Sequence, residues 1–289
     1  LFFSTPTPQY PILSGLVGSE MCIRDSFIPY DYLPKTPHVD DQRIRNLCYR
    51  LQKDFERWMI SFILKCKSKN IVLTGGCALN CVANCKIPDR FNIWIMPSPG
   101  DAGSSLGAAA LIEKKKIRWR HPYLGHNIIK ELNPKEIVKH LLEHKLCGVA
   151  NGRAEFGPRA LGNRSLLADP RLDIKDTVNE VKQRQKFRPF APIVLEEHAN
   201  EWFEMPAGKS NSPYMSFVAK CKKPEEIPAV CHTDGTSRVQ TVNRHQHPDL
   251  YHAMRQWYAE TGCPVVLNTS LNIKAVSYTH LTLPTICSV

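Results

Sequence analysis

Short apolar runs alternate with longer segments of helical periodicity in the first half of the chain. Ile71-Val72-Leu73 and Ile93-Trp94-Ile95-Met96 have the length and composition of buried strands. Around them, the spacing of apolar or small residues predicts helices from about 41 to 65–69, from 77 to about 85, and over 103–116. Of all the features of the sequence, this alternation most restricts the possible folds, because it is typical of α/β domains.

A second α/β region follows a basic segment marked by Pro and Gly, and we place the boundary within 117–134. Asn133 before Pro134 predicts the start of a helix, since Asn caps helices and Pro is tolerated at their first position. The run 146–150 then predicts a strand, with further strands near 191–195, 214–218 and 264–267 and a helix at about 249–260.

Composition narrows the class of protein. No stretch approaches about 18 uninterrupted apolar residues, so we expect no membrane span. The eleven Cys are scattered along a chain long enough to build a core, which favours free thiols and a reducing, cytoplasmic compartment. The formal net charge of +11 favours anionic partners, either nucleic acid or phosphorylated small molecules.

Two glycine-containing turns follow the two early strands, at Thr74-Gly75-Gly76 and at Gly100-Asp101-Ala102-Gly103. Such turns let the backbone approach a ligand, and a helix start after them offers free N–H groups to phosphate. The Asp101 carboxylate can hold a metal or order a hydroxyl. The spacing alone fits tight strand-to-helix turns equally well, so both interpretations stay open.

A basic block over 153–190 carries Arg residues interleaved with Gly, Pro and Phe. Guanidinium groups bind phosphate oxygens in pairs, and Lys adds a point charge. The block therefore predicts a loop pocket for a phosphate or acyl phosphate. A solvated basic face is the usual alternative, and Phe187 and Phe190 would also allow nucleic-acid bases to stack.

Smaller signals are ambiguous. Cys77, Cys81 and Cys85 fit one helix face, for which thiol packing is favoured over a metal site. In His247-Pro248-Asp249, we expect Asp249 to cap the following helix. His232-Thr233-Asp234-Gly235 is either a turn fixed by Asp-Gly or a ligand-pocket edge, and Asn268-Thr269-Ser270 is either a phosphate contact or a strand end.

Several of these motifs resemble those of known families. Residues 71–76 resemble the adenosine-contacting motif of the actin, sugar-kinase and heat-shock ATPase superfamily. Residues 73–84 with 97–110, the run Gly152–Ser165, the run Lys182–Pro192 and the run Val266–Asn272 are similar, in order, to O-carbamoyltransferases of the nodulation-factor, cephamycin and tobramycin type. The resemblance covers about 71–274.

The resemblance implies a fold and a domain organisation. We expect the C-terminal half of a ribonuclease-H-like kinase-fold domain over 27–120, a linker and helix over 121–145, and a YrdC-like domain over 146–274. Residues 19–26 and 276–285 resemble peptides translated from sequencing-adapter DNA, so we expect both ends, 1–26 and 275–289, to be foreign to the protein.

The resemblance also implies an activity. An ATP-dependent enzyme, with Mg²⁺, would form carbamoyl adenylate from carbamoyl phosphate and transfer the carbamoyl group to a hydroxyl of a sugar or secondary metabolite. The groups expected to grip the phosphates and the carbamoyl oxygen are Arg153, Arg159, Arg164, Lys182, Arg184 and Arg188. The residues expected to bind the nucleotide or its phosphates are Gly75, Gly76, Asn80, Gly157, His232, Asp234, Arg238, Asn268, Thr269 and Ser270. Asp101 would be a ligand of iron or another divalent metal, together with histidines from an earlier part of the chain.

Three alternatives remain. One is an enzyme that makes threonylcarbamoyl adenylate for tRNA modification, which the run 157–162 argues against because it resembles the O-carbamoyl family. Another is a nucleic-acid-binding module without catalysis, whose binding would weaken with salt. The third is a fragment that binds nucleotide without turnover.

Overall fold

The structure, a computed structural model, describes residues 42–114, 118–128 and 133–272. The expected foreign ends, 1–26 and 275–289, lie outside these residues. The chain divides into two compact units, residues 1–117 (unit 1) and 118–289 (unit 2), and each is described by itself. Among the described residues, no helix combines the length and the apolar character that crossing a membrane requires.

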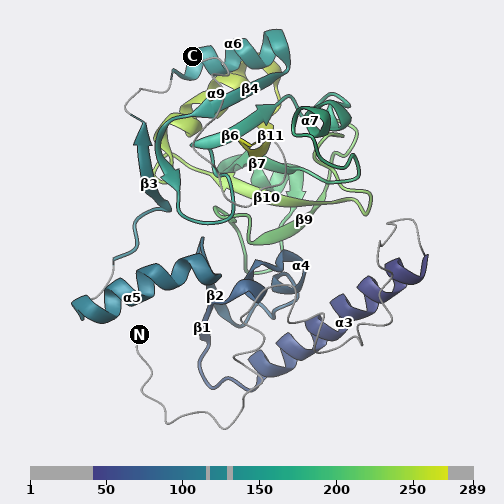
Figure 1. Cartoon of the computed structure of the whole chain (residues 1–289). Coiled ribbons are helices and arrows are strands. Elements are labelled where there is room, and N and C mark those ends of the chain that lie inside the picture. Colours follow the sequence, from purple (N-terminus) through teal and green to yellow (C-terminus); the bar gives the residue numbers. More distant parts are fainter. Residues whose placement is uncertain (1–41, 115–117, 129–132, 273–289) are drawn as a thin grey trace. The chain divides into compact units, whose positions relative to one another are not determined.

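Unit 1 is built around a two-stranded parallel sheet (Figure 1). Its elements are α3 (Gln42–Leu64), β1 (Asn70–Leu73), the 3₁₀ turn η2 (Gly76–Leu79), α4 (Cys81–Asn84), β2 (Asn92–Ile95), the 3₁₀ turn η3 (Asp101–Gly103) and α5 (Ser104–Glu113). Residues 71 and 93 are register partners, as are 73 and 95. The order of helices and strands is the one that the sequence predicts.

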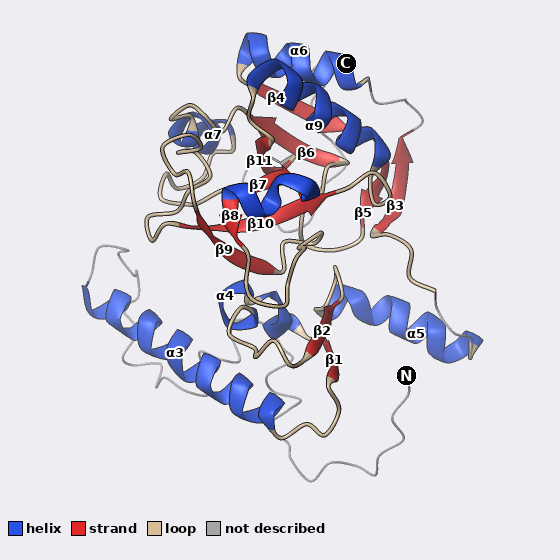
Figure 2. Cartoon of the chain, turned by 180° about the vertical axis from the view of Figure 1, so that it is seen from behind, coloured by secondary structure: helices blue, strands red, loops and turns tan. Residues whose placement is uncertain are grey.

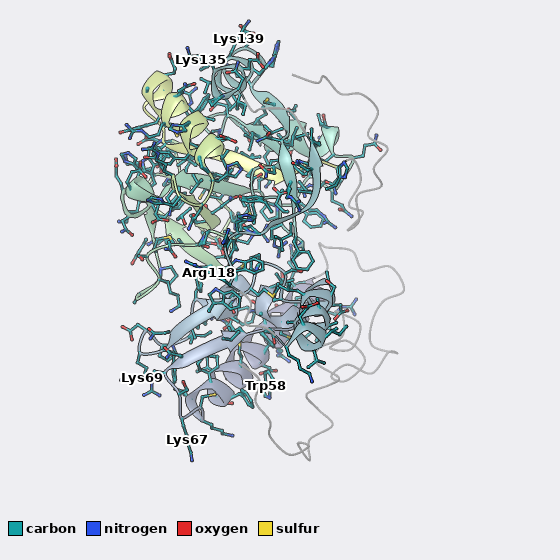
Figure 3. All side chains as sticks on the ribbon, turned by 90° about the vertical axis from the view of Figure 1, so that its left-hand side faces the viewer. Trp58, Lys67, Lys69, Arg118, Lys135 and Lys139 are labelled. Atoms are coloured by element: carbon teal, nitrogen blue, oxygen red, sulfur yellow. The ribbon has the colours of Figure 1, made fainter. Side chains whose placement is uncertain are left out.

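The core of unit 1 is small. Met59 and Ile63 of α3 pack with Ala83, Ile87 and Phe91, against one face of the sheet. The aromatic side chains on the flank of α3 stay more open, and Trp58, which Figure 3 labels, is 40 % exposed. The apolar stripe of α3 is thus wider than the surface that unit 1 buries.

The helix expected over 77–85 is interrupted. Cys77 lies in η2 and Cys81 begins α4, with Asn80 between them in a non-helical conformation. The expectation that one continuous helix face carries the three thiols is therefore wrong, because the Asn80 side chain caps a new helix there.

Unit 2 contains a mixed seven-stranded sheet in the order β4-β6-β11-β7-β10-β9-β8, with a separate β3-β5 ribbon. Its elements are β3 (Tyr123–Ile128), α6 (Pro134–His144), β4 (Leu146–Ala150), β5 (Gly152–Glu155), β6 (Arg164–Ala168), α7 (Lys175–Val181), β7 (Ala191–Leu195), η4 (Glu196–His198), α8 (Ala199–Trp202), β8 (Phe203–Glu204), β9 (Phe217–Cys221), β10 (Thr236–Val242), α9 (Pro248–Thr261) and β11 (Val265–Ser270).

The large sheet carries a buried cluster on each face. Helices α6 and α9 lie side by side over one face, where they pack on Ile193 and Val266 (Figure 2). Alternate residues of the same strands, including Val194 and Val265, pack into the second cluster. Because both faces are covered, β7 is buried along its whole length, as the continuous apolar run in the sequence indicates.

Several local predictions can be compared with these elements. The strands expected over 146–150 and 191–195 are confirmed, and Asn133 caps α6 by accepting from the Lys135 backbone N–H at 3.1 Å. The strand expected near 214–218 instead covers 217–221, because 213–215 form a turn in which Met215 has a positive φ. Asp249 does not cap α9: His247 does, through Nδ1 and the Leu250 backbone N–H at 3.3 Å.

Candidate active site

The two glycine turns of unit 1 lie against each other at the carboxyl ends of β1 and β2. The Gly75 N–H donates to the Pro99 carbonyl at 2.6 Å, and a Cβ added to Gly100 would lie 3.9 Å from the Gly76 Cα. Gly75 has a φ of 87°, which other residues rarely adopt. The strand ends that the sequence singles out therefore form one edge, the usual place for ligands in α/β sheets.

Asn80, expected at a nucleotide, is engaged inside unit 1. Its Oδ1 accepts from the Ala83 backbone N–H at 3.1 Å, and its Nδ2 donates to Gln52 Oε1 at 2.9 Å. Gln52 in turn donates to Glu56 Oε1 at 3.0 Å. The Asn80 amide thus joins α3 to the start of α4, and a ligand would have to replace one of these bonds.

Glu56 is a buried carboxylate that the sequence reasoning missed. It is 4 % exposed, and its Oε2 contacts Lys86 Nζ closely and Lys53 Nζ at 3.4 Å. Burial alone would raise the pKa of Glu56, but the contacts with Lys86, Gln52 and Lys53 outweigh burial and lower it. Its spacing from Met59 and Ile63, three and seven residues, was the available signal, because it puts Glu56 on the buried stripe of α3.

Asp101, the expected metal ligand, begins η3 and is exposed. Among the described residues, no group of three or more His, Cys, Asp or Glu side chains is arranged to hold a metal ion. The described part of the chain thus places no second carboxylate, thiol or imidazole pair around Asp101 that would complete a metal site, and its role as a metal ligand stays a prediction.

In unit 2, Glu155 organises the loop that carries Arg159. One carboxylate oxygen of Glu155 accepts from the backbone N–H groups of Leu161, Asn163 and Arg164, at 2.7, 2.8 and 3.2 Å. Gly157, at the start of this loop, has a φ of 147°, and Arg159 is half-buried. Glu155 thus closes the loop that begins at Gly157-Pro158. The first N–H group that it binds, that of Leu161, lies six positions after it in the chain.

Arg164 uses its guanidinium to hold backbone. Its Nη1 donates to the carbonyls of Asn151 (2.6 Å) and Asn163 (2.8 Å), and its Nη2 donates to those of His126 and Gly152, both at 3.0 Å. Burial lowers the pKa of Arg164, and the Glu155 charge opposes this effect. Arg153 is exposed and donates to the Leu124 carbonyl at 3.4 Å. Arg164 thus joins β6 to the β3-β5 ribbon, whereas Arg153 links the two strands of the ribbon.

Lys182 is 3 % exposed and reaches the end of β11. Its Nζ contacts the Ser270 carbonyl closely, lies 3.3 Å from Ser270 Oγ and 2.7 Å from Asn272 Oδ1, and donates to the Asn272 carbonyl at 3.2 Å. Burial lowers the pKa of Lys182 to about 8, with a further contribution from the Arg184 charge. Asn272 is a residue that the sequence reasoning missed, although it ends the motif 266–272.

Arg184 lies among other cations. Its Nε donates to Asn179 Oδ1 at 2.6 Å, and its guanidinium carbon is 4.4 Å from the centre of the Phe190 ring. Burial, together with the charges of Arg188 and Arg238, lowers the pKa of Arg184 to about 10. We use the term cation cluster for Lys182, Arg184, Arg188 and Arg238. By contrast, Lys135 and Lys139 on α6 point away from the body of unit 2 (Figure 3).

His232 and Asp234 lie in the turn before β10. The His232 ring Nε2 is 3.1 Å from the Phe190 carbonyl, and Asp234 Oδ1 accepts from the Thr236 backbone N–H at 3.0 Å. Burial lowers the pKa of His232, and the charge of Arg238 acts in the same direction. The Asp-Gly turn that the sequence predicts thus exists and also lies beside the cation cluster.

Asn268 is 2 % exposed on β11, and both N–H groups of its amide are used. Its Nδ2 donates to the Ala160 carbonyl at 2.9 Å and to Gln240 Oε1 at 2.8 Å. Gln240, another residue that the sequence reasoning missed, donates from Nε2 to the Leu161 carbonyl at 3.0 Å. Thr269 is half-buried, one position along the strand and so on the opposite face.

His247 and Tyr123 support the same loop from its other side. The Tyr123 hydroxyl donates to the Leu161 carbonyl at 3.2 Å, and His247 Nε2 is 2.8 Å from Asn163 Oδ1. Because His247 Nδ1 accepts from Leu250, Nε2 carries the proton of the neutral ring. Burial lowers the pKa of His247 to about 4. Loop 157–164 is therefore held by Glu155, Gln240 and His247.

The structure brings some of the expected site residues together. Within unit 2, Lys182 contacts Ser270, and the charges of Arg188 and Arg238 act on Arg184. His232 and Asp234 lie beside these cations, and Asn268 holds the loop next to Arg159. Arg153 and Arg164 are bound to backbone carbonyls of the ribbon instead. A buried lysine beside half-buried arginines, two of the four groups with lowered pKa values, marks this cluster as a candidate functional site.

Comparison with known proteins identifies the family. The model "Carbamoyltransferase N-terminus" matches residues 50–110, and "Carbamoyltransferase C-terminus" matches residues 138–281. The chain belongs to the carbamoyltransferase family. The N-terminal match covers both glycine turns, and the C-terminal match covers the cation cluster.

Curated relatives of this carbamoyltransferase-family chain include nodulation proteins. Nodulation protein NolO of Bradyrhizobium diazoefficiens is 36 % identical over 81 % of the chain and 50 % of NolO. NolNO of Sinorhizobium fredii is 35 % identical over 80 % of the chain and 39 % of NolNO, and nodulation protein U of Azorhizobium caulinodans is 36 % identical over 71 % and 40 %. The chain spans half or less of the length of these relatives.

Proposed function

We propose that the protein is part of an ATP-dependent O-carbamoyltransferase and that unit 2 forms carbamoyl adenylate. Membership of the family supports transfer of a carbamoyl group. The observation that carries the proposal is the cation cluster, in which burial and neighbouring charges lower the pKa values of Lys182 and Arg184. A bound anion would relieve both effects, because its charge would offset those of Lys182 and Arg184, and its oxygens would accept from the arginines of the cluster.

The reaction has two stages. Carbamoyl phosphate first loses its phosphate to water and gives carbamate. The carbamate oxygen then attacks the α-phosphorus of ATP, so that carbamoyl adenylate forms and pyrophosphate leaves. In the second stage, an acceptor hydroxyl attacks the carbamoyl carbon, loses its proton and expels AMP. The acceptor in this proposal is a sugar or another hydroxylated small molecule, and we place the reaction in the cytoplasm.

The proposed roles follow the positions of the side chains. Lys182, Arg184, Arg188 and Arg238 stabilise the charge on the phosphates and on the pyrophosphate that leaves. Arg159 reaches the ligand from its loop, and Ser270 Oγ contributes a hydroxyl. We assign Arg164 and Arg153 an indirect role. Their hydrogen bonds to backbone carbonyls hold the β3-β5 ribbon, which leads into the loop that carries Gly157 and Arg159.

We further propose that unit 1 is the C-terminal half of a ribonuclease-H-like domain and that unit 2 is YrdC-like. In unit 1, Gly75 and Gly76 would accommodate the adenosine of the intermediate at the edge described above. The single carboxylate of Asp101 does not complete a site for iron or another divalent metal among the described residues, so we assign no step to such a metal. Mg²⁺ would enter with ATP.

Exchange of pyrophosphate into ATP tests this function. The chain should exchange labelled pyrophosphate into ATP only when carbamoyl phosphate is present, and Arg184→Met or Arg159→Ala should abolish exchange while circular dichroism stays unchanged. Arg255→Met is the matched control, because Arg255 is an exposed arginine of α9 that should leave exchange intact. Full exchange in Arg184→Met would contradict the assigned site, and salt-sensitive oligonucleotide binding without any exchange would favour a nucleic-acid module.

A further inference from the structure

The amide of Asn268 is fixed in one orientation. Both of its N–H groups donate to oxygen atoms, the Ala160 carbonyl at 2.9 Å and Gln240 Oε1 at 2.8 Å. The orientation of Gln240 is fixed in turn, because its Nε2 donates to the Leu161 carbonyl at 3.0 Å. Backbone carbonyls can only accept, so these two contacts fix which end of each side-chain amide is the nitrogen and which is the oxygen. Asn268 has no N–H group left to donate to a phosphate.

The other side of this amide is an acceptor without a donor. Asn268 Oδ1 is buried, in a residue that is only 2 % exposed, and it has no hydrogen-bond partner among the described residues. A buried polar atom without a partner is uncommon in folded proteins, and it often marks a place where a water or a ligand binds. An amide oxygen can accept a hydrogen bond and cannot donate one, so the missing partner of Asn268 Oδ1 is a donor group, either neutral or cationic.

The position of Asn268 connects this acceptor with the cation cluster. Asn268 and Ser270 are two residues apart on β11 and share a face of the sheet, and Ser270 Oγ is 3.3 Å from Lys182 Nζ. Gln240, which contacts Asn268, shares a face of β10 with Arg238, two residues away. The acceptor thus lies on the face of the sheet that carries donors for anionic oxygens.

We propose that Asn268 Oδ1 accepts a hydrogen bond from the amino group of the carbamoyl moiety and thereby selects carbamoyl over acyl substrates. This inference rests on the proposed function and adds a residue that determines substrate specificity. Carbamoyl phosphate has several oxygen acceptors and one amino group as its donor. The cation cluster would bind the oxygens, and Asn268 would bind the amino group.

The cations alone cannot make this distinction. Acetyl phosphate has the same phosphate, the same carbonyl and nearly the same shape, but a methyl group replaces the amino group. In the acetyl compound, Oδ1 would face a methyl group and stay without a donor. A site that is built to pair a buried acceptor therefore discriminates against the analogue that lacks the donor.

Calorimetric titration of the 289-residue chain with three ligands tests the inference. The ligands are freshly dissolved carbamoyl phosphate, acetyl phosphate and inorganic phosphate. The wild type should bind carbamoyl phosphate about tenfold more tightly than acetyl phosphate, the size expected of one hydrogen bond to a buried acceptor. In Asn268→Ala, this ratio should fall to about one, while the affinity for inorganic phosphate changes by less than about threefold.

Gln240→Met is the matched control. It removes hydrogen bonds from the same network but leaves Asn268 Oδ1 in place, held through the Ala160 carbonyl. The preference for carbamoyl phosphate should persist in this variant. If Asn268→Ala does not fold, Asn268→Leu, which keeps the size of the side chain and removes the acceptor, is titrated in its place and should lose the preference as well.

The outcomes separate this inference from the proposed function. Equal binding of carbamoyl and acetyl phosphate by the wild type would overturn the role of Asn268 and indicate a buried water at Oδ1, while the anion site would stand. A preference that survives in folded Asn268→Ala would also overturn it. If the wild type binds none of the three ligands, the proposed anion site and this inference both fail.

Discussion

The two units differ in how their β-sheets are covered. In unit 2, alternate residues of β7 and β11 enter two different buried clusters, so both faces of the large sheet are covered. In unit 1, one face of the two-stranded sheet packs on α3 and α4, whereas on the other face Val72 is 55 % and its register partner Trp94 is 42 % exposed. Helix α5 has no buried residue, although Ala and Leu make up much of it.

This difference shows where the stability of the chain comes from. Parallel strands usually occur in sheets with both faces covered, and a two-stranded sheet buries little apolar surface. We therefore expect unit 2 to be the more stable part. It also holds its candidate site residues among buried neighbours, whereas the glycine turns of unit 1 depend on a small core.

Trp257→Ala should cause the largest loss of stability, and it tests the difference between the two units directly. Trp257 is 1 % exposed between α9 and the sheet, and its Nε1 donates to the Val265 carbonyl at 2.9 Å. Loss of the ring should reduce the unfolding free energy of unit 2 by about 3–5 kcal/mol. Segment-resolved hydrogen exchange in urea measures this loss, and exchange in unit 1 is the internal control. A change below about 1 kcal/mol in unit 2 would contradict the assigned core.

The second prediction concerns pH. The pKa of folded His247 is about 4, below the ordinary value of 6.5, so the unfolded state binds the proton more readily than the folded state does. Stability should therefore fall as the pH drops from about 6.5 to about 4, by about 3 kcal/mol from this residue. Urea titrations at several pH values should show the gap between wild type and His247→Gln narrowing over this range. A constant gap would show that His247 does not titrate as a buried neutral ring.

The third prediction concerns the acidic residue that closes loop 157–164. Glu155→Ala removes the acceptor of three backbone N–H groups and should cost about 2 kcal/mol of unfolding free energy. Glu155→Gln keeps one carbonyl oxygen at the same place and should cost less. Thermal and urea denaturation of both variants measure the difference. Equal losses would show that the charge of Glu155 matters rather than its position as an acceptor.

The smallest effect is expected in a matched pair of valines. Val265→Ala, at a fully buried position of strand β11, should cost about 2 kcal/mol, because it removes buried methyl groups and leaves a cavity. Val72→Ala, on the open face of unit 1, should cost less than about 0.5 kcal/mol. Urea titration of both variants compares the same chemical change at the two sites. Similar losses would mean that the Val72 face is covered in solution.

Much of the fold could be predicted because it depends on local pattern. The run 191–195 is apolar throughout and becomes a strand buried on both faces, and Asn133-Pro134 starts α6 as capping chemistry requires. The predictions that failed depended on competing partners. Asn80 caps a new helix and ends the series of thiols, and His247 caps α9 in place of Asp249.

The candidate site was predictable in its residue types and less so in their roles. The sequence indicated a basic block and included Arg184 and Lys182, which lie in the cation cluster. It did not indicate that Gln240 and Asn268 would hold the loop at 160–161, because these residues are about 80 and 108 positions away from it in the chain. Contacts over such separations leave no periodic signal in the sequence.

The sequence by itself determined the order of helices and strands in unit 1, part of that order in unit 2, the glycine turns and the excess of cations, because these follow from spacing and residue type. Only the tertiary structure decided which cations gather. Arg164 and Arg184 look alike in the sequence, but backbone carbonyls use the donors of Arg164, whereas Arg184 lies among other cations over Phe190. A guanidinium binds whichever acceptors the fold places around it, and for Arg164 these include a β3 carbonyl 38 positions away in the chain.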